Sequence, residues 1–448
     1  MRKILISIAY ICLLISTVQA QITLIPDPYF ESKLISLGVD SDGAINGQIL
    51  SSDAAAVTYL DIGNSNNQGW ITDLIGIDSF VNLVYLSCSG NQITSLSLNN
   101  LPLLRKLRVT SNQLTTLNLS STVNLDTLWA SNNLITTIDL SSCVNLVELR
   151  FTGNLITTLD LSNNVNLEYI YCYSNELDSI EFSTHPNLTF MSCWGNNLNT
   201  IDFSGMPNLY SLYCHDNKIT EFDLSNVPNL RTFYCQDNRL PEIDLSFSTY
   251  LDYFNCSDNL LSSLDFAGAS NISELSCKNN YFNTLDVTGI FTLYNFDSRG
   301  NSPGLRICVN DIVAAQNAPN WDKDPAASYT LSCALPNVEG QVSVDTNSNC
   351  VVDSLEQGLS SCIIEWKDSV SSQVYYTITN PNGAYSVGLP MGTYYTKITT
   401  PNIYWVPCLD SQIVHILSSG SVSSSDWAIN DVINCPYVTV DISAPFLR

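Results

Sequence analysis

The sequence predicts a mainly β protein, in which a solenoid of short stacked coils with an N-terminal helical cap is followed by a small β-sandwich domain. Two observations carry this prediction: a sequence period of 21 residues, and the loss of that period after Pro336, where short strands separated by Gly, Pro and Asn turns begin. The expected segments are 1–20 (signal peptide), 21–81 (cap and irregular first repeats), 82–301 (solenoid), 302–335 (C-terminal cap), 336–430 (β-sandwich) and 431–448 (start of a truncated further module).

Ten consecutive 21-residue units run from Asn82 to Phe291, and one column of the repeat always contains asparagine. Its members are Asn91, Asn112, Asn133, Asn154, Asn175, Asn196, Asn217, Asn238, Asn259, Asn280 and Asn301. A short amide side chain can donate to and accept from the backbone at a corner where a strand ends, so this column predicts an asparagine ladder. Apolar residues recur at the positions of Leu83, Leu86, Ile93, Leu96 and Leu98, which gives each coil one layer of a continuous core.

This pattern resembles leucine-rich repeats, and closely the 21-residue kind of secreted Bacteroidetes proteins in which cysteine replaces the third strand leucine. The column in question contains Cys88, Cys172, Cys193, Cys214, Cys235, Cys256 and Cys277. The resemblance covers roughly residues 24–333. Side chains that point inward from adjacent parallel strands are poorly placed for bridging, so these cysteines are expected to be unpaired, buried and apolar in character.

Both ends of the solenoid carry cap signals. Asp27 and Pro28 predict the start of an amphipathic helix that Gly38 ends. The apolar face of that helix contains Phe30, Leu34 and Leu37. At the other end, Cys308 and Cys333 bracket an insert around Trp321, which predicts a disulfide-closed cap. The remaining cysteines suggest the further pairs Cys350 with Cys362 and Cys408 with Cys435.

The first residues predict export. A basic start, an apolar run from Ile4 to Ile15 and Val18-Gln19-Ala20 have the order of a cleaved secretory signal, and no later stretch is long and apolar enough to span a membrane. The 42 acidic residues against 17 basic ones predict repulsion from phosphate backbones and anionic lipid headgroups, which argues against nucleic acid as a partner, and the lack of a spanning stretch argues against insertion into membranes. The expected location is extracellular, with attachment to the bacterial outer surface possible.

The second domain resembles the B-type repeats of bacterial surface adhesins over about residues 336–408. The residues that carry the resemblance are Gly340-x-Val342-x-x-Asp345, Gly358-Leu359, Asn382-Gly383-Ala384-Tyr385 and Gly392-x-Tyr394. The domain contains a twelve-residue loop with calcium-binding spacing. The predicted ligands are Asp345, Asn347, Asn349, the carbonyl of Val351, Asp353 and Glu356. Position 6 is Cys350 where glycine is usual, which either strains the turn or tethers it to another cysteine; the alternative is a polar turn without Ca²⁺.

Outward positions of the strand face predict a binding surface. The three outward columns headed by Tyr85, Ser87 and Ser89 contain ten aromatic residues, whereas the columns of the opposite face headed by Thr94, Ser95 and Ser97 contain none. The predicted ligand-binding residues are Trp129, Tyr169, Tyr171, Tyr173, Phe190, Trp194, Tyr213, His215, Tyr234 and Tyr253. The alternative is that large rings only cover and stiffen the sheet.

The opposite face carries a column of like charges whose members are Asp139, Asp160, Glu181, Asp202, Asp223, Asp244, Asp265 and Asp286. Such a column is either a cation-binding ladder or, as we favour, a set of side chains that each accept hydrogen bonds from the following turn.

Together these features predict a non-catalytic binding or adhesion protein that recognises a protein or glycan, since no nucleophile motif, metal cluster or phosphate loop is visible. The alternative is a targeting or scaffold part of a longer exported enzyme or surface structure. A sorting domain of the type IX secretion kind is expected beyond the truncated module. The oligomeric state is not indicated.

Overall fold

The computed structural model describes residues 21–431 except 65–68, 332, 334–336, 354–355, 371–372, 390–391, 402–404 and 417–422. The predicted signal peptide and the expected module after residue 431 therefore lie outside the described residues. The chain divides into two compact units, of which the first runs to Asn197 and includes Ser204–Met206, while the second comprises Leu198–Phe203 and the residues from Pro207 onward. The domain boundaries given above remain predictions.

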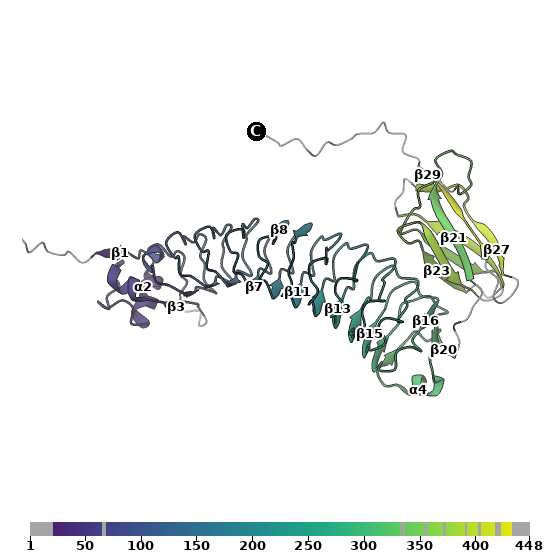
Figure 1. The fold of residues 1–448 in the computed structure, drawn as a ribbon, viewed down its shortest axis with the longest axis horizontal. Helices are drawn as coiled ribbons and strands as arrows, with labels where there is room; N and C mark the ends of the chain where they lie inside the picture. Colours follow the sequence, from purple (N-terminus) through teal and green to yellow (C-terminus); the bar gives the residue numbers. More distant parts are fainter. Residues whose placement is uncertain are drawn as a thin grey trace, which may run out of the picture. The chain divides into compact units, whose positions relative to one another are not determined.

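The first unit stacks coils so that one short strand of each pairs in parallel with the next (Figure 1). The strands follow in the order β3 (Tyr59–Asp61), β4 (Tyr85–Ser87), β5 (Lys106–Arg108), β6 (Thr127–Trp129), β7 (Glu148–Arg150), β9 (Tyr169–Tyr171) and β11 (Phe190–Ser192). In each strand the central residue points into the core: Leu86, Leu107 and Leu128 are fully buried. The predicted leucine-rich-repeat solenoid of 21-residue coils is confirmed.

The second unit begins with the same arrangement. Its strands are β12 (Ser211–Tyr213), β13 (Thr232–Tyr234), β14 (Tyr253–Asn255), β15 (Glu274–Ser276), β17 (Asn295–Asp297) and β19 (Trp321–Asp322). The second extended stretch of the coil forms strands only in some repeats. These are the pair β8 (Thr158–Asp160) and β10 (Ser179–Glu181) in the first unit, and β16 (Thr284–Asp286), β18 (Arg306–Cys308) and β20 (Ser328–Thr330) in the second.

The asparagine ladder is confirmed. The amide of Asn133 donates to the carbonyl oxygens of Val109 and Ala130 at 3.0 and 3.2 Å, and its oxygen accepts the backbone N–H of Leu114 at 3.0 Å. Each ladder residue thus joins its own corner to the preceding coil, and the pattern repeats along both units. Backbone groups that would otherwise be buried without partners are satisfied in this way.

A second asparagine column, which the sequence interpretation missed, lies just before the strands. Asn124, Asn145 and Asn166 each donate from the amide to a backbone carbonyl 22 residues earlier, at 2.8, 3.1 and 3.0 Å. These side chains are exposed, unlike the buried ladder. Water can replace their bonds, so the column contributes less to stability.

The cysteine column is buried and unpaired, as predicted. Cys88 and Cys172 are completely buried, and burial raises the pKa of each thiol to about 12. Cys143, in a turn column, is also buried and free. Inside the solenoid these residues act as small apolar side chains.

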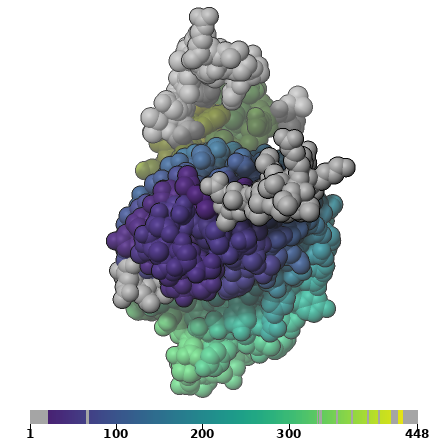
Figure 2. All heavy atoms as spheres, turned by 90° about the vertical axis from the view of Figure 1, so that its left-hand side faces the viewer, coloured from purple at the N-terminus to yellow at the C-terminus, as the bar shows by residue number. Residues whose placement is uncertain are grey.

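The N-terminal cap contains β1 (Ile22–Leu24), α2 (Pro28–Ser36), β2 (Gln48–Leu50), α3 (Ser51–Ala56) and the 3-10 turn η1 (Ile77–Ser79); its surface is purple in Figure 2. Asp27 caps α2 by accepting the N–H groups of Tyr29 and Phe30, while its other oxygen accepts the backbone N–H and the hydroxyl of Thr72. One carboxylate therefore both starts the helix and ties it to the following coils. The prediction that Leu37 belongs to the apolar face is wrong, because it lies past the helix end and is exposed.

The C-terminal cap is closed by the predicted disulfide between Cys308 and Cys333. The helix α4 (Ile312–Asn317) begins at Asp311, whose side chain accepts two backbone N–H groups. Trp321 packs edge-on against Phe296, with ring centroids 5.2 Å apart, and so covers the last apolar layer.

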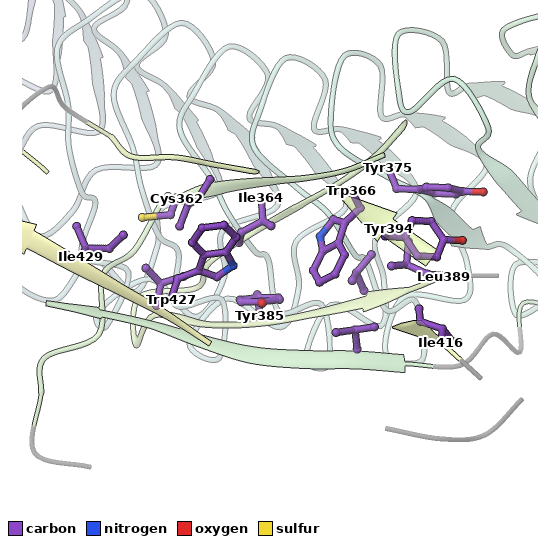
Figure 3. Packing of buried hydrophobic residues seen from close by; sticks show 14 residues of the cluster. Cys362, Ile364, Trp366, Tyr375, Tyr385, Leu389, Tyr394, Ile416, Trp427 and Ile429 are labelled. Carbon is purple, nitrogen blue, oxygen red and sulfur yellow. The ribbon is translucent and has the colours of Figure 1, made fainter. Parts of the chain in front are cut away.

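The domain after the cap is a sandwich of two sheets. The first sheet has the order β24 (Ala384–Gly388), β21 (Asn337–Val344), β29 (Trp427–Asp431) and β26 (Trp405–Pro407), with β28 (Ser423–Ser424) beside β21. The second sheet has the order β23 (Val374–Ile378), β22 (Ile363–Asp368), β25 (Gly392–Thr399) and β27 (Gln412–Ile416). Trp366, Tyr385, Tyr394 and Trp427 fill the space between them (Figure 3). The short strands predicted after Pro336 are present, as β21 to β25 up to Thr399, and the later strands complete the same two sheets.

The buried ladder can be tested against the exposed asparagine column. Asn133→Ala removes an acceptor and a donor from a corner that water cannot reach, so we expect it to lower the free energy of unfolding by about 3 kcal/mol. Asn145→Ala, at an exposed position one coil away, is expected to cost less than about 1 kcal/mol. Urea denaturation followed by far-UV circular dichroism measures both; equal effects would contradict the role given to the buried ladder.

Candidate functional site

The predicted binding residues lie on the outer face of the parallel strands. Six of them, Trp129, Tyr169, Tyr171, Tyr173, Phe190 and Trp194, belong to the first unit, and four, Tyr213, His215, Tyr234 and Tyr253, belong to the second. All except the exposed Tyr169 are half-buried, because neighbouring side chains of the same face cover part of each. The strand register sets Phe190 beside Tyr169 in the first unit and Tyr213 beside Tyr234 in the second.

In the first unit, arginines alternate with the rings. Trp129 lies between Arg108 and Arg150 of the neighbouring strands, whose guanidinium carbons are 3.7 and 4.3 Å from its ring centroid. Arg150 also lies 4.6 Å from the centroid of Tyr171, and Arg108 lies 5.5 Å from that of Tyr85. These distances are those of cation–π contacts.

Rings extend this row at both ends. Tyr59 stacks on Tyr85 with centroids 4.3 Å apart, and Tyr171 contacts Phe190 at 4.7 Å. We call the row the arginine–aromatic stack; it consists of Tyr59, Tyr85, Arg108, Trp129, Arg150, Tyr171 and Phe190. Because the interior members cover each other's faces, the stack presents ring edges and guanidinium N–H groups outward.

Other predicted residues form smaller contacts. Tyr173 stacks on Trp194 at 4.5 Å in the first unit, and in the second Tyr213 meets Tyr234 edge-on at 5.1 Å. Burial lowers the pKa of His215 and raises the pKa of Tyr234. Burial therefore favours the neutral form of the His215 ring.

The sequence interpretation missed Tyr59, Arg108 and Arg150 as members of this surface. Tyr59 lies in the irregular first coils, ahead of the regular period. The arginines were visible: residues 108, 129, 150 and 171 occupy one column and read Arg, Trp, Arg, Tyr. A count of the aromatic residues in this column does not include the arginines that separate the rings.

A groove of about 930 Å³ borders the stack in the first unit, where the strands begin. Its charged lining residues are Arg105, Lys106, Asp126 and Glu168, and its neutral lining includes the exposed asparagine column. Arg105 and Asp126 form an ion pair at 2.7 Å.

The twelve-residue loop of the sandwich brings its predicted oxygen ligands together. Asn347 and Asn349 both donate from their amides to one oxygen of Asp353, at 2.7 and 3.0 Å. Asp345 accepts the N–H groups of Asn349 and Cys350, while Glu356 closes the loop by accepting those of Thr346 and Asp353. Val351 is exposed at the turn. Rotation of the two amides would direct their oxygens at the point where their nitrogens now converge, so the residues fit a Ca²⁺ ion.

Cys350 forms a disulfide with Cys408, so the suggested pairs of Cys350 with Cys362 and of Cys408 with Cys435 are both wrong. Cys362 is buried and free within the described residues, and Cys435 lies outside them. Cys350 has a φ of 60°, the left-handed conformation for which glycine is usual. The cross-link thus holds the turn in the conformation that glycine would adopt freely. It also means that the grouping of Asp345 with Cys350 and Cys408 is no thiolate metal site.

The acidic column is explained by local bonds. Asp139, Asp160, Asp223 and Asp244 each accept the backbone N–H of the residue two positions on, at 2.8 to 3.0 Å. Hydrogen bonds from the following serine lower the pKa of each carboxyl. These contacts support the local interpretation over a cation ladder.

No helix among the described residues is long and apolar enough to cross a membrane. No known family model matches the sequence, and no curated protein matches it. Among solved structures, the chain is similar to the functional domain of InlJ from Listeria monocytogenes, which includes a cysteine ladder: 21% identity, a TM-score of 0.59, and coverage of 93% of this chain and 100% of that one. It is also similar to the internalin inlF from Listeria monocytogenes, with 20% identity, a TM-score of 0.51, and coverage of 70% and 99%. These likenesses show the leucine-rich-repeat fold.

The acidic column makes a pH prediction. The pKa of Asp223 lies below its ordinary value of 3.8, first because the Ser225 hydroxyl donates to it and then because the Ser225 backbone does. A carboxyl whose pKa is lower in the folded state than in the unfolded state stabilises the fold at pH values above its unfolded-state pKa. That contribution is lost as the pH falls through its folded-state pKa. Ser225→Ala should therefore raise the pKa of Asp223 toward 3.8 and move acid unfolding to slightly higher pH. NMR titration of the carboxyl carbons measures the pKa of Asp223, and the pKa of Asp160 should stay unchanged as the control.

Proposed function

We propose that this chain is an exported, non-enzymatic recognition protein whose solenoid binds a protein or glycan through its strand face, with the sandwich domain as a spacer. The observation that carries the proposal is the arginine–aromatic stack: large side chains held in order on a rigid sheet, only partly covered. Aromatic and arginine side chains dominate the binding energy of interfaces, and a rigid surface loses little conformational entropy when a ligand docks.

Export is part of the proposal. The basic and apolar order of the first twenty residues and two disulfides in the described chain support an oxidising compartment outside the cytoplasm. Similarity in fold to a Listeria internalin is compatible with a bacterial surface protein. We further propose a Bacteroidetes-type protein, sorted by type IX secretion.

Binding and stability should separate on the strand face. Tyr171→Ala combined with Tyr213→Ala is expected to reduce binding at least about tenfold, because aromatic anchors typically cost 2 kcal/mol or more when truncated. The melting temperature should change little, since both rings lie outside the core. Glycan arrays and arrays of extracellular proteins, probed with the intact chain, measure binding. Thr158→Ala, on the opposite face, is the control; unchanged binding of the double variant to every array hit would refute the strand-face site.

We also propose that the sandwich is a B-type adhesin module whose loop binds Ca²⁺ as a structural ion. The convergence of Asn347, Asn349 and Asp353 on one point supports this, as does Glu356 at the twelfth position. With an ion bound at this point, the amides of Asn347 and Asn349 would rotate and present their oxygens to it as ligands. The bound ion would stiffen the spacer. It would have no role in chemistry.

Calcium should then stabilise the sandwich without affecting the solenoid. At about 100 times its dissociation constant, an ion that binds only the folded state adds about 2.7 kcal/mol to the free energy of unfolding. Calorimetry of the intact chain should show a calcium-dependent shift in one transition, and Glu356→Gln should weaken it. Glu365→Gln, on β22 away from the loop, is the control. A wild-type chain without any calcium-dependent shift would contradict the proposal.

A further inference from the structure

We propose that Arg108 of the arginine–aromatic stack and Lys106, two residues before it on β5, form an anchoring site for acidic side chains of a protein ligand. The inference rests on the proposed function and names the chemistry of its ligand. Five observations carry it: the local enrichment of cations, the partners those cations have, the way Arg108 is held, the covered faces of Trp129, and the signs of the surrounding charges.

Cations are scarce in this chain and concentrated here. The protein has 17 basic residues and a formal net charge of −25, yet Arg105, Lys106, Arg108 and Arg150 fall within 46 consecutive residues (150 − 105 + 1). All four belong to the first unit, three on the coil of β5 and Arg150 on the coil of β7, with the coil of β6 between them. The strand face of the first unit therefore carries a local group of positive charges on an otherwise acidic protein.

Two of these cations already have acidic partners. Arg105 pairs with Asp126 at 2.7 Å, and Arg150 pairs with Glu148 at 2.5 Å. No ion pair forms at Lys106 or Arg108 with any residue that the structure describes. Both belong to β5 and lie two residues apart, so both point outward on the same face.

Arg108 is held in place before any ligand arrives. Its guanidinium lies over Trp129, and its Nε atom is covered, without a hydrogen-bond partner in the described part of the chain. The terminal nitrogens remain for an external acceptor. A planar guanidinium fixed against a ring loses little rotamer entropy on binding and suits a carboxylate through two parallel hydrogen bonds.

The covered ring faces argue against a sugar at this position. Stacking on a sugar needs a free aromatic face, and both faces of Trp129 are occupied by guanidinium groups. What the stack offers is ring edges, which carry partial positive charge, and N–H donors. Both kinds of group favour anionic oxygen.

The surrounding charges favour a protein segment over a uniform polyanion. Asp61 lies two strands from Arg108 in the same column, and Glu148 lies two strands from Lys106 in its column. The adjoining groove also contains Glu168. A polymer with a negative charge on every unit would meet these carboxylates, whereas a peptide with one or two acidic residues among neutral ones would not.

Selection from a random peptide library displayed on phage, with the full-length chain as bait, tests the proposal. We expect enriched peptides to contain Asp or Glu, and the affinity of such synthetic peptides to fall at least about tenfold in Lys106→Gln with Arg108→Gln. Arg108→Lys, which keeps the charge but loses the planar fork, should weaken binding by an intermediate factor. Lys106 is exposed, so Lys106→Gln alone tests the site without a risk to folding.

Lys278→Gln, which removes an equal charge from the strand face of the second unit, is the matched control and should leave peptide affinity unchanged. Absence of acidic enrichment, or peptide binding that survives the double substitution, overturns the proposal. So does equal or tighter binding of oligogalacturonate, a uniform polyanion. Peptides that lose affinity with Tyr213→Ala but not with Arg108→Gln would overturn this inference and leave the proposed function standing.

Discussion

The rest of the structure depends on one constraint: each coil must satisfy its corner backbone groups through the coil before it. The buried asparagine ladder meets this constraint, because one amide bonds to its own corner and to two groups of the preceding coil, as Asn133 does with Val109 and Leu114. A single coil could not do so alone. The bonds therefore lock neighbouring coils in register, and that register makes a sequence column into a physical row on the surface.

Rows have different consequences inside and outside the solenoid. In the core, the cysteine row buries no charge, because buried thiols with raised pKa values stay neutral. On one outer face, a row of carboxylates places like charges side by side, and Asp139 and Asp160 each accept a hydrogen bond from the backbone of the serine two residues on rather than from a neighbour. On the strand face, rings and guanidinium groups alternate and attract each other. The stack therefore holds together through contacts between coils, which the carboxylate row lacks.

The sequence was enough to predict the solenoid, its register, the N-terminal helix and the disulfide between Cys308 and Cys333, because each rests on a local or strictly periodic signal. It failed where partners are distant and aperiodic. The bond between Cys350 and Cys408 spans 58 residues and several strands, and no spacing rule identifies it. Leu37 was misplaced for a simpler reason: one apolar residue at a helix end has no second turn to fix its direction.

For the candidate surface, periodicity predicted which residues share a face but not what each one offers to a ligand. Ten aromatic residues in outward columns predicted a surface that binds a protein or glycan, whereas the alternation of Arg108, Trp129, Arg150 and Tyr171 covers the ring faces and leaves edges and donors. The difference decides which chemistry can be recognised. Free faces suit sugars, and sandwiched guanidinium groups suit carboxylates. In a chain with a net charge of −25, Arg150 pairs with Glu148, whereas Arg108 lies over Trp129 and forms no ion pair with a carboxylate of the described residues, so it stays available to a partner.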